Sequence, residues 1–99
     1  MMAVTTRAKE ALLEKKRAAN ITDREVGLRV ASNSAGDYVL VADRARADDQ
    51  VVEHEGATVL LVDTDTQGKL TGVTMDCRDT PEGRKELVLA RSASDGVAR

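Results

Sequence analysis

The sequence contains very few of the residues that usually build metal, stacking or catalytic sites. Its 99 residues include one cysteine, one histidine, one proline and one aromatic residue. The single cysteine, Cys77, excludes an internal disulfide and is typical of a reducing compartment. Tyr38 alone cannot form the row of aromatic side chains on which nucleic acid bases stack. We therefore expect neither a disulfide-stabilised fold nor a stacking platform.

Charge and hydropathy give no sign of a nucleic acid or membrane partner. Fifteen basic and seventeen acidic residues give a net charge of -2 with both signs mixed, which suits a soluble surface. The densest basic patch, Lys15 to Arg17, alternates with Glu10 and Glu14 at helical spacing, which indicates a solvated helix face. No segment approaches the roughly 20 apolar residues of a membrane span, and the N-terminus lacks the apolar region of a signal peptide. We expect a cytoplasmic protein.

The N-terminal segment has the pattern of an amphipathic helix. Thr5 or Thr6 can cap a helix that runs to about Ala19, and Asn20 can end it. The Lys/Glu pairs fall on one stripe of this helix, and the apolar residues fall on the other: Ala8, Ala11, Leu12 and Ala19. One helix is therefore expected to open the domain.

From Gly27 onward the apolar residues recur with a period of two, which predicts short strands. The first hairpin joins 27–30 to 38–41 through Asn33-Ser34-Ala35-Gly36. The second joins 50–54 to 57–62, because Gly56 can take the positive φ of a tight turn. Val59 to Val62 is apolar on both faces, as in a central strand. Residues 43–49 are expected to form a surface loop or a short helical turn.

The C-terminal part continues this pattern. Val73, Met75 and Cys77 alternate with polar residues in the next strand, and 80–83 is a strong turn signal. A last strand over 85–90 ends the fold. We expect a single domain over residues 1–90, followed by a disordered tail over 91–99, which has little to bury.

These elements, taken in order, resemble a known family. The segments that carry the likeness are the capped helix, Gly27-Leu28-Arg29-Val30, Asp49 to Glu53, Glu55-Gly56 with Val59 to Asp63, and Leu70 to Asp76. Together they resemble the HesB-like family, whose best-known members are A-type iron-sulfur carriers, over most of Val4 to Leu89. The resemblance implies an α+β, mainly β fold: a compact β-sandwich of short mixed strands with one N-terminal amphipathic helix.

The family's activity resides in three cysteines that this chain lacks. One lies in a glycine-rich hairpin after the GLRV-like strand, a position that falls around Asn33-Ser34 here. The other two form a Cys-Gly-Cys motif near the C-terminus, where this chain has Ala90-Arg91-Ser92-Ala93. No cluster ligand can be carried over. We therefore expect a degenerate family member that binds no iron-sulfur cluster or other cofactor and acts as an accessory or interaction module.

Two residues remain as candidate metal ligands in an alternative hypothesis. In that hypothesis the chain is an iron or iron-sulfur carrier that works as a homodimer through Cys77, helped by carboxylates or His54. However, Cys77 shares a strand face with Val73 and Met75, so we expect a buried, inert thiol. His54 lies between two glutamates at a hairpin end, where we expect it to be solvated. We therefore assign no metal ligand.

Other site patterns are incomplete. Asp63 to Thr71 follows the first nine positions of a calcium loop, but the twelfth is Thr74 where a glutamate is needed, and a strand precedes it. We expect a turn capped by Asp63 or Asp65. The carboxylate pairs Asp48/Asp49 and Asp63/Asp65 are expected to be solvated loop charges. We predict no catalytic residue and no enzyme, because only His54 could act as a base for any of the serines: Ser32, Ser34, Ser92 and Ser94.

The sequence names no partner. We expect a partner surface, if one exists, at Glu53-His54-Glu55 or at the turn over Asn33 to Gly36. Both a monomer and a homodimer are compatible with the sequence.

Overall fold

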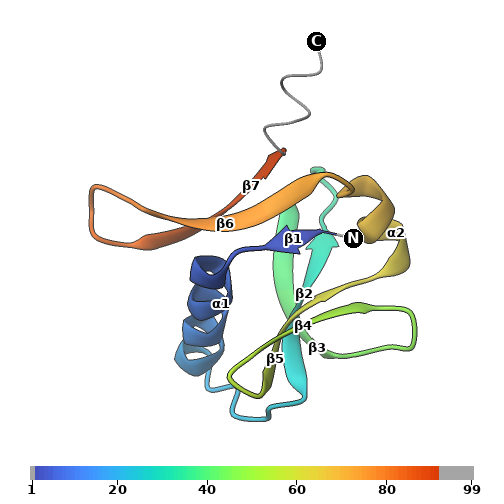
Figure 1. Ribbon diagram of the computed structural model, residues 1–99, viewed down its shortest axis with the longest axis horizontal. Coiled ribbons are helices and arrows are strands. Elements are labelled where there is room, and N and C mark those ends of the chain that lie inside the picture. Colours follow the sequence, from blue (N-terminus) through green and yellow to red (C-terminus); the bar gives the residue numbers. More distant parts are fainter. Residues whose placement is uncertain (1, 92–99) are drawn as a thin grey trace.

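The computed structural model describes residues 2–91 and contains two sheets flanked by a helix (Figure 1). The larger sheet has the strand order β3-β2-β5-β4, and the smaller has the order β1-β6-β7. Both sheets are mixed, because β2 pairs parallel to β5 and β1 pairs parallel to β6. The elements in chain order are β1 (Ala3–Val4), α1 (Thr6–Ala18), β2 (Val26–Ser32), β3 (Tyr38–Arg44), β4 (Gln50–His54), β5 (Ala57–Val62), α2 (Thr64–Lys69), β6 (Val73–Asp79) and β7 (Lys85–Arg91).

This architecture confirms the predicted α+β, mainly β class. Figure 1 shows the smaller sheet crossing one end of the larger one, with α1 packed alongside. The last strand includes Arg91, one residue beyond its expected end. The rest of the expected tail, 92–99, lies outside the described residues. Within 2–91, no helix has the length and apolar character needed to cross a membrane.

The helix α1 begins and ends as its sequence predicts. The Thr5 hydroxyl accepts a hydrogen bond from the Ala8 amide at 3.1 Å and donates one to Asp76 at 2.7 Å. It therefore caps α1 and joins it to β6. Asn20 follows the helix with a φ of 61°, which is typical of a residue that ends a helix. The expected apolar stripe is buried except for Ala19, which is exposed because it lies past the last helical turn.

The strand β5 is an inner strand of the larger sheet, as its uniformly apolar sequence predicted. All six of its residues are buried, between β2 on one side and β4 on the other. A Cβ at Gly27 of β2 would lie 2.7 Å from the Thr58 Cγ2 atom, so the close approach of β2 to β5 requires glycine there. The core between the sheets and α1 is built from aliphatic residues and methionine, among them Met2, Leu12, Val30, Leu60, Val62, Val73 and Met75.

The predicted turns are present, and one strand, β1, was not predicted. Both hairpins of the larger sheet form, and Glu55 and Gly56 have φ values of 54° and 79°, as a type I′ turn requires. The short helix α2 occupies the predicted turn after β5. The strand β1 was missed because two residues are too few to show any periodicity.

Candidate functional site

The sandwich is open along the side where the edge strands β3 and β7 face a common groove. This β3–β7 groove has a volume of about 770 Å³. It is lined by residues of both edge strands, of the strands behind them, of the β6–β7 turn and of α1: Lys15, Leu28, Val30, Tyr38, Val39, Leu40, Met75, Thr80, Arg84, Lys85, Glu86, Leu87 and Leu89. The groove combines this volume with apolar and charged lining residues and is the first place to look for a ligand.

Several apolar side chains in the groove lie on the core side of their sheet and yet remain in contact with solvent. Leu89 pairs with Met75, which is 4% exposed, but Leu89 itself is 37% exposed. Across the groove, Leu40 pairs with the buried Val30, and Tyr38, two residues earlier on the same face, is 40% exposed. Side chains alternate along a strand, so these residues point into the sandwich and not outward. The groove thus exposes an uncovered margin of the core.

The backbone of both edge strands is also unpaired on the groove side. The Thr80 amide donates a hydrogen bond to the Arg84 carbonyl at 2.8 Å, so Thr80 and Arg84 are a hydrogen-bonded pair of the β6–β7 ladder. In an antiparallel ladder such pairs alternate with pairs that are not hydrogen-bonded. By this alternation Glu86 and Val88 face β6, whereas the amides of Lys85, Leu87 and Leu89 face away from it. The β2–β3 ladder begins with the bond from Asn33 to Asp37 and leaves every second residue of β3 unpaired in the same way.

The charged residues of the groove are mostly basic. Lys85 forms an ion pair with Glu14 at 3.0 Å, which joins the start of β7 to α1. This contact raises the pKa of Lys85, first through the hydrogen bond to Glu14. Lys15 and Arg84 form no ion pair with any residue in 2–91, and Glu86 is the one acidic residue of the lining. The groove therefore carries a positive charge beside its apolar surface.

The opposite side of the sandwich is closed by a side-chain amide. Gln50, the first residue of β4, accepts a hydrogen bond from the Met2 amide at 3.0 Å and donates one to the Met2 carbonyl at 2.7 Å. This amide clamp joins the start of the smaller sheet to the edge of the larger one. Met2 is 2% exposed as a result. A shallower hollow of about 260 Å³ lies over the clamp.

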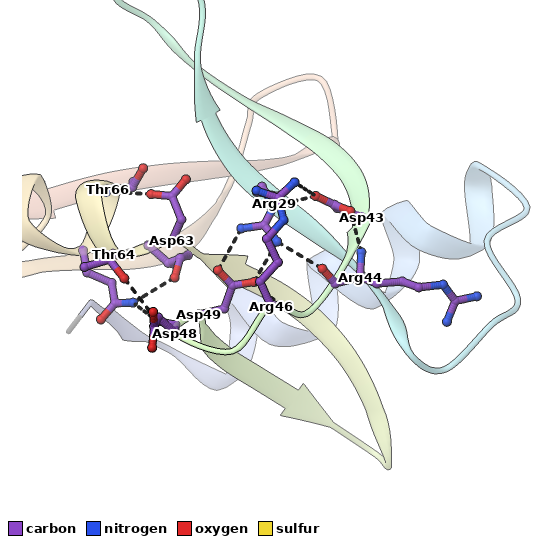
Figure 2. A network of polar contacts seen from close by, with 11 residues as sticks. Arg29, Asp43, Arg44, Arg46, Asp48, Asp49, Asp63, Thr64 and Thr66 are labelled. Carbon is purple, nitrogen blue, oxygen red and sulfur yellow. Dashed lines mark hydrogen bonds and ion pairs between the residues drawn. The ribbon is translucent and has the colours of Figure 1, made fainter.

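A polar network on the larger sheet surrounds Arg29 of β2 (Figure 2). The guanidinium donates to Asp43 at 2.7 Å and to both oxygens of Asp49 at 2.7 and 3.0 Å, and it also reaches the Arg44 carbonyl. The side chains of Arg29 and Asp49 are 6% and 3% exposed. Hydrogen bonding to Asp49 raises the pKa of Arg29, and the hydrogen bonds that Arg29 donates lower the pKa of Asp49 and Asp43. All three groups are therefore charged at neutral pH.

This network corrects the expectation that Asp48 and Asp49 are solvated loop charges. Asp48 is exposed, but Asp49 is the buried partner of Arg29. It also accepts a hydrogen bond from the Arg46 amide at 2.7 Å, which orders the loop between β3 and β4. The position of Arg29 between the apolar residues Leu28 and Val30 was the one sign in the sequence of a buried charge. Its partners, Asp43 and Asp49, are 14 and 20 residues away in the chain, so local patterns could not identify them. The network binds protein groups on every side and is structural.

Lys16 also differs from its expected place on a solvated helix face. It is 2% exposed, and its ammonium donates to the Thr58 carbonyl at 2.7 Å and to the Asp23 carbonyl at 3.4 Å. Burial lowers the pKa of Lys16, and the nearby Asp23 opposes this shift. The residue joins α1 to β5, while its neighbours Lys15 and Arg17 remain exposed as predicted.

The structure places Cys77 where the sequence predicted. It lies on the core side of β6, is 4% exposed and pairs with Leu87 of β7. Its two neighbours on the same face, Val73 and Met75, are also buried. The thiol is thus buried on the same face of β6 as these apolar side chains.

His54 is not the solvated histidine that was expected. Its side chain is 17% exposed, and its Nε2 atom is buried with no hydrogen bond, 3.4 Å from a Glu55 carboxylate oxygen. His54 lies in the larger sheet and Cys77 in the smaller one. Among residues 2–91, no three His, Cys, Asp or Glu side chains gather as metal ligands would.

The segment that resembled a calcium loop is a capped helix. Asp63 accepts a hydrogen bond from the Thr66 amide at 2.8 Å and begins α2, as the capped-turn hypothesis predicted. The bonds from Thr66 lower the pKa of Asp63. Asp65 is exposed in the first turn of α2. No acidic cage forms here.

Comparison with solved structures identifies the fold. The chain superimposes on a crystal structure of IscA with the 2Fe-2S cluster with a TM-score of 0.58 and 15% identity, over 92% of this chain and 85% of IscA. It superimposes on Escherichia coli SufA, involved in biosynthesis of iron-sulfur clusters, with a TM-score of 0.67 and 21% identity, over 91% of this chain and 84% of SufA. No family model and no curated protein matches the sequence. The chain has the fold of IscA and SufA, which confirms the HesB-like fold that its sequence predicted.

Proposed function

We propose that this chain is a HesB-like protein that holds no iron-sulfur cluster and acts as a non-catalytic interaction module. One observation carries the proposal: the only thiol of the chain, Cys77, is buried on the core side of β6. Protein-bound clusters are usually held by four cysteine thiolates. One chain can supply one thiolate and a homodimer two, and each would have to leave an apolar core.

The donor set of the described residues supports the same conclusion. Histidine is the usual substitute for a missing cysteine ligand, but His54 lies in the other sheet. The buried carboxylate of Asp49 is already hydrogen-bonded to Arg29. The resemblance places a family ligand at Asn33-Ser34, and here the Asn33 carboxamide accepts hydrogen bonds from the Ala35 and Asp37 amides, which close the turn.

An interaction role is supported by the β3–β7 groove. Exposed apolar side chains that belong to the core side of a sheet mark a surface suited to a partner. Tyr38 and Leu89 are two such side chains, and the edge strands beside them offer unpaired backbone groups.

The proposal is tested by reconstitution. Protein purified without air is incubated with iron and sulfide and desalted, and its iron, sulfide and visible absorption are measured per chain. We expect no stoichiometric iron and no cluster absorption. In parallel, a thiol reagent should modify Cys77 only after unfolding in urea, because the thiol is buried.

The alternative carrier hypothesis makes the opposite prediction. Stoichiometric iron and sulfide in the wild type, lost in Cys77→Ala while the fold is retained, would establish a cluster on Cys77 and overturn the proposal. Met75→Leu, a substitution on the same buried face of β6 that leaves Cys77 in place, serves as the control for effects of core substitution.

A further inference from the structure

We propose that the β3–β7 groove binds an extended, acidic peptide segment of a partner protein, which adds a strand to the free edge of β7. This deepens the interaction role proposed above and rests on it. Strand addition is a common mode of peptide recognition, in which backbone hydrogen bonds supply affinity and side-chain pockets supply specificity. Three independent features of the groove support this occupant.

The first feature is the backbone of β7. The amides of Lys85, Leu87 and Leu89 face away from β6 and border the groove. β7 has seven residues, so about 23 Å of edge is available at the usual rise of roughly 3.3 Å per residue. A segment of about six residues could pair along it. No other strand covers this edge within residues 2–91.

The second feature is the apolar lining. Leu87 and Leu89 of β7 and Tyr38 and Leu40 of β3 all lie on the core side of their sheets. A strand added to β7 would point every second side chain toward these residues and cover them. Apolar residues at alternate positions of the peptide are therefore required.

The third feature is charge. Lys15 of α1 and Arg84 of the β6–β7 turn border the groove without an ion-pair partner in the described part of the chain, and Lys85 lies beside them. Acidic residues at one end of the peptide would complement these groups. A second copy of this chain would bring the same basic residues into the groove, and opposed like charges disfavour that pairing.

The test uses defined fluorescent peptides and the full chain. The first probe carries two glutamates followed by three valines that alternate with threonines. A second replaces the glutamates with lysines, and a third replaces the valines with serines. Fluorescence anisotropy at low salt should show saturable binding of the first probe alone, weakened at higher ionic strength. No binding of the first probe, or equal binding of the lysine probe, would overturn the proposal.

Matched variants locate the binding site. Arg84→Glu and Lys15→Glu should each weaken binding of the first probe by about threefold or more, the usual size of one exposed charge contact. Arg78→Glu and Arg17→Glu change exposed arginines that do not line the groove and should leave binding unchanged. Leu89→Ser should abolish saturable binding, with circular dichroism showing that the fold is kept. Equal losses in groove and control variants would contradict the assignment.

Amide exchange distinguishes strand addition from other modes of binding. Exchange at Leu87 and Leu89 should slow when the first probe is added, whereas Glu86 and Val88 should already exchange slowly because they face β6. Unchanged exchange at Leu87 and Leu89 would refute strand addition. A dimer by sedimentation that Leu89→Ser converts to a monomer would identify a second copy as the occupant and overturn the peptide proposal. None of these results depends on iron content, so the two proposals can fail separately.

Discussion

The two sides of the sandwich differ in how they end. On the β1–β4 side, the Gln50 amide holds the backbone of Met2, and Met2 is almost fully buried. On the β3–β7 side no such contact joins the sheets in the described part of the chain, and Leu89 keeps over a third of its surface in water. A small mixed sandwich can therefore be sealed by one well-placed amide. On the β3–β7 side, where no such contact is present among the described residues, the core side of the sheets borders a groove.

Arg29 gives the strongest test of how the closed architecture is held. Arg29→Met removes the partner of the buried Asp49 carboxylate. Asp49 also accepts a hydrogen bond from the Arg46 amide, so the Arg29–Asp49 pair orders the 43–49 loop that precedes Gln50. We expect a loss of about 3–5 kcal/mol in the free energy of unfolding, measured with urea. Arg44→Met breaks an exposed pair with Asp23 and should leave the urea midpoint nearly unchanged.

A double variant and a pH series separate the charge effect from packing. Arg29→Met with Asp49→Leu should recover much of the loss, because no buried charge is left unpaired. The pKa of Asp49 is lower in the folded state than its ordinary value of 3.8, so its contribution is present above pH 4 and is lost as pH falls through the folded-state pKa. Asp49→Asn should flatten this acid dependence. A slope identical to that of the wild type would show that the pair does not govern acid stability.

The amide clamp gives an intermediate effect. Gln50→Ala removes two hydrogen bonds to Met2, and we expect a loss of about 1–2 kcal/mol in the free energy of unfolding together with faster amide exchange in β1. Glu53→Ala, on the exposed face of the same strand, is the matched control. If β1 exchanges at the wild-type rate in Gln50→Ala, the clamp does not close this side.

The open side should give the smallest effect on stability. Leu89→Ser is expected to lower the free energy of unfolding by under about 1 kcal/mol, because Leu89 is only partly buried. Met75→Ala, at the residue paired with Leu89, should cost about 2–5 kcal/mol because it creates a cavity in the core. Equal losses at the two positions would mean that the groove is closed in solution.

Local sequence patterns were sufficient for much of the fold. Thr5 capped the predicted helix, Gly56 marked the predicted turn, and the apolar run at Val59 to Val62 became the buried central strand. These features depend on residues that lie close together in the chain, so periodicity and turn chemistry can reveal them. The burial of Cys77 followed in the same way from the alternation of β6.

The candidate site could not be found by those means. The groove is formed by β3 and β7, which pair with other strands and are more than 40 residues apart. Leu89 and Leu87 have the same alternating pattern, and only the position of the larger sheet leaves one of them more exposed. Similarly, Lys16 and Lys15 are adjacent lysines, and only the position of the Thr58 carbonyl determines which is buried.

The sequence by itself determined a mainly β fold class with one N-terminal helix and the shortage of metal ligands, because strand periodicity and the number of cysteines are properties of the linear chain. The HesB-like architecture came from the resemblance of its segments to that family. The tertiary structure alone decided which charges are buried, as with Arg29 and Asp49, and which side of the sandwich is open. The physical reason is that burial and pairing depend on distances between segments far apart in sequence. Those distances are set only when the two sheets and α1 pack together.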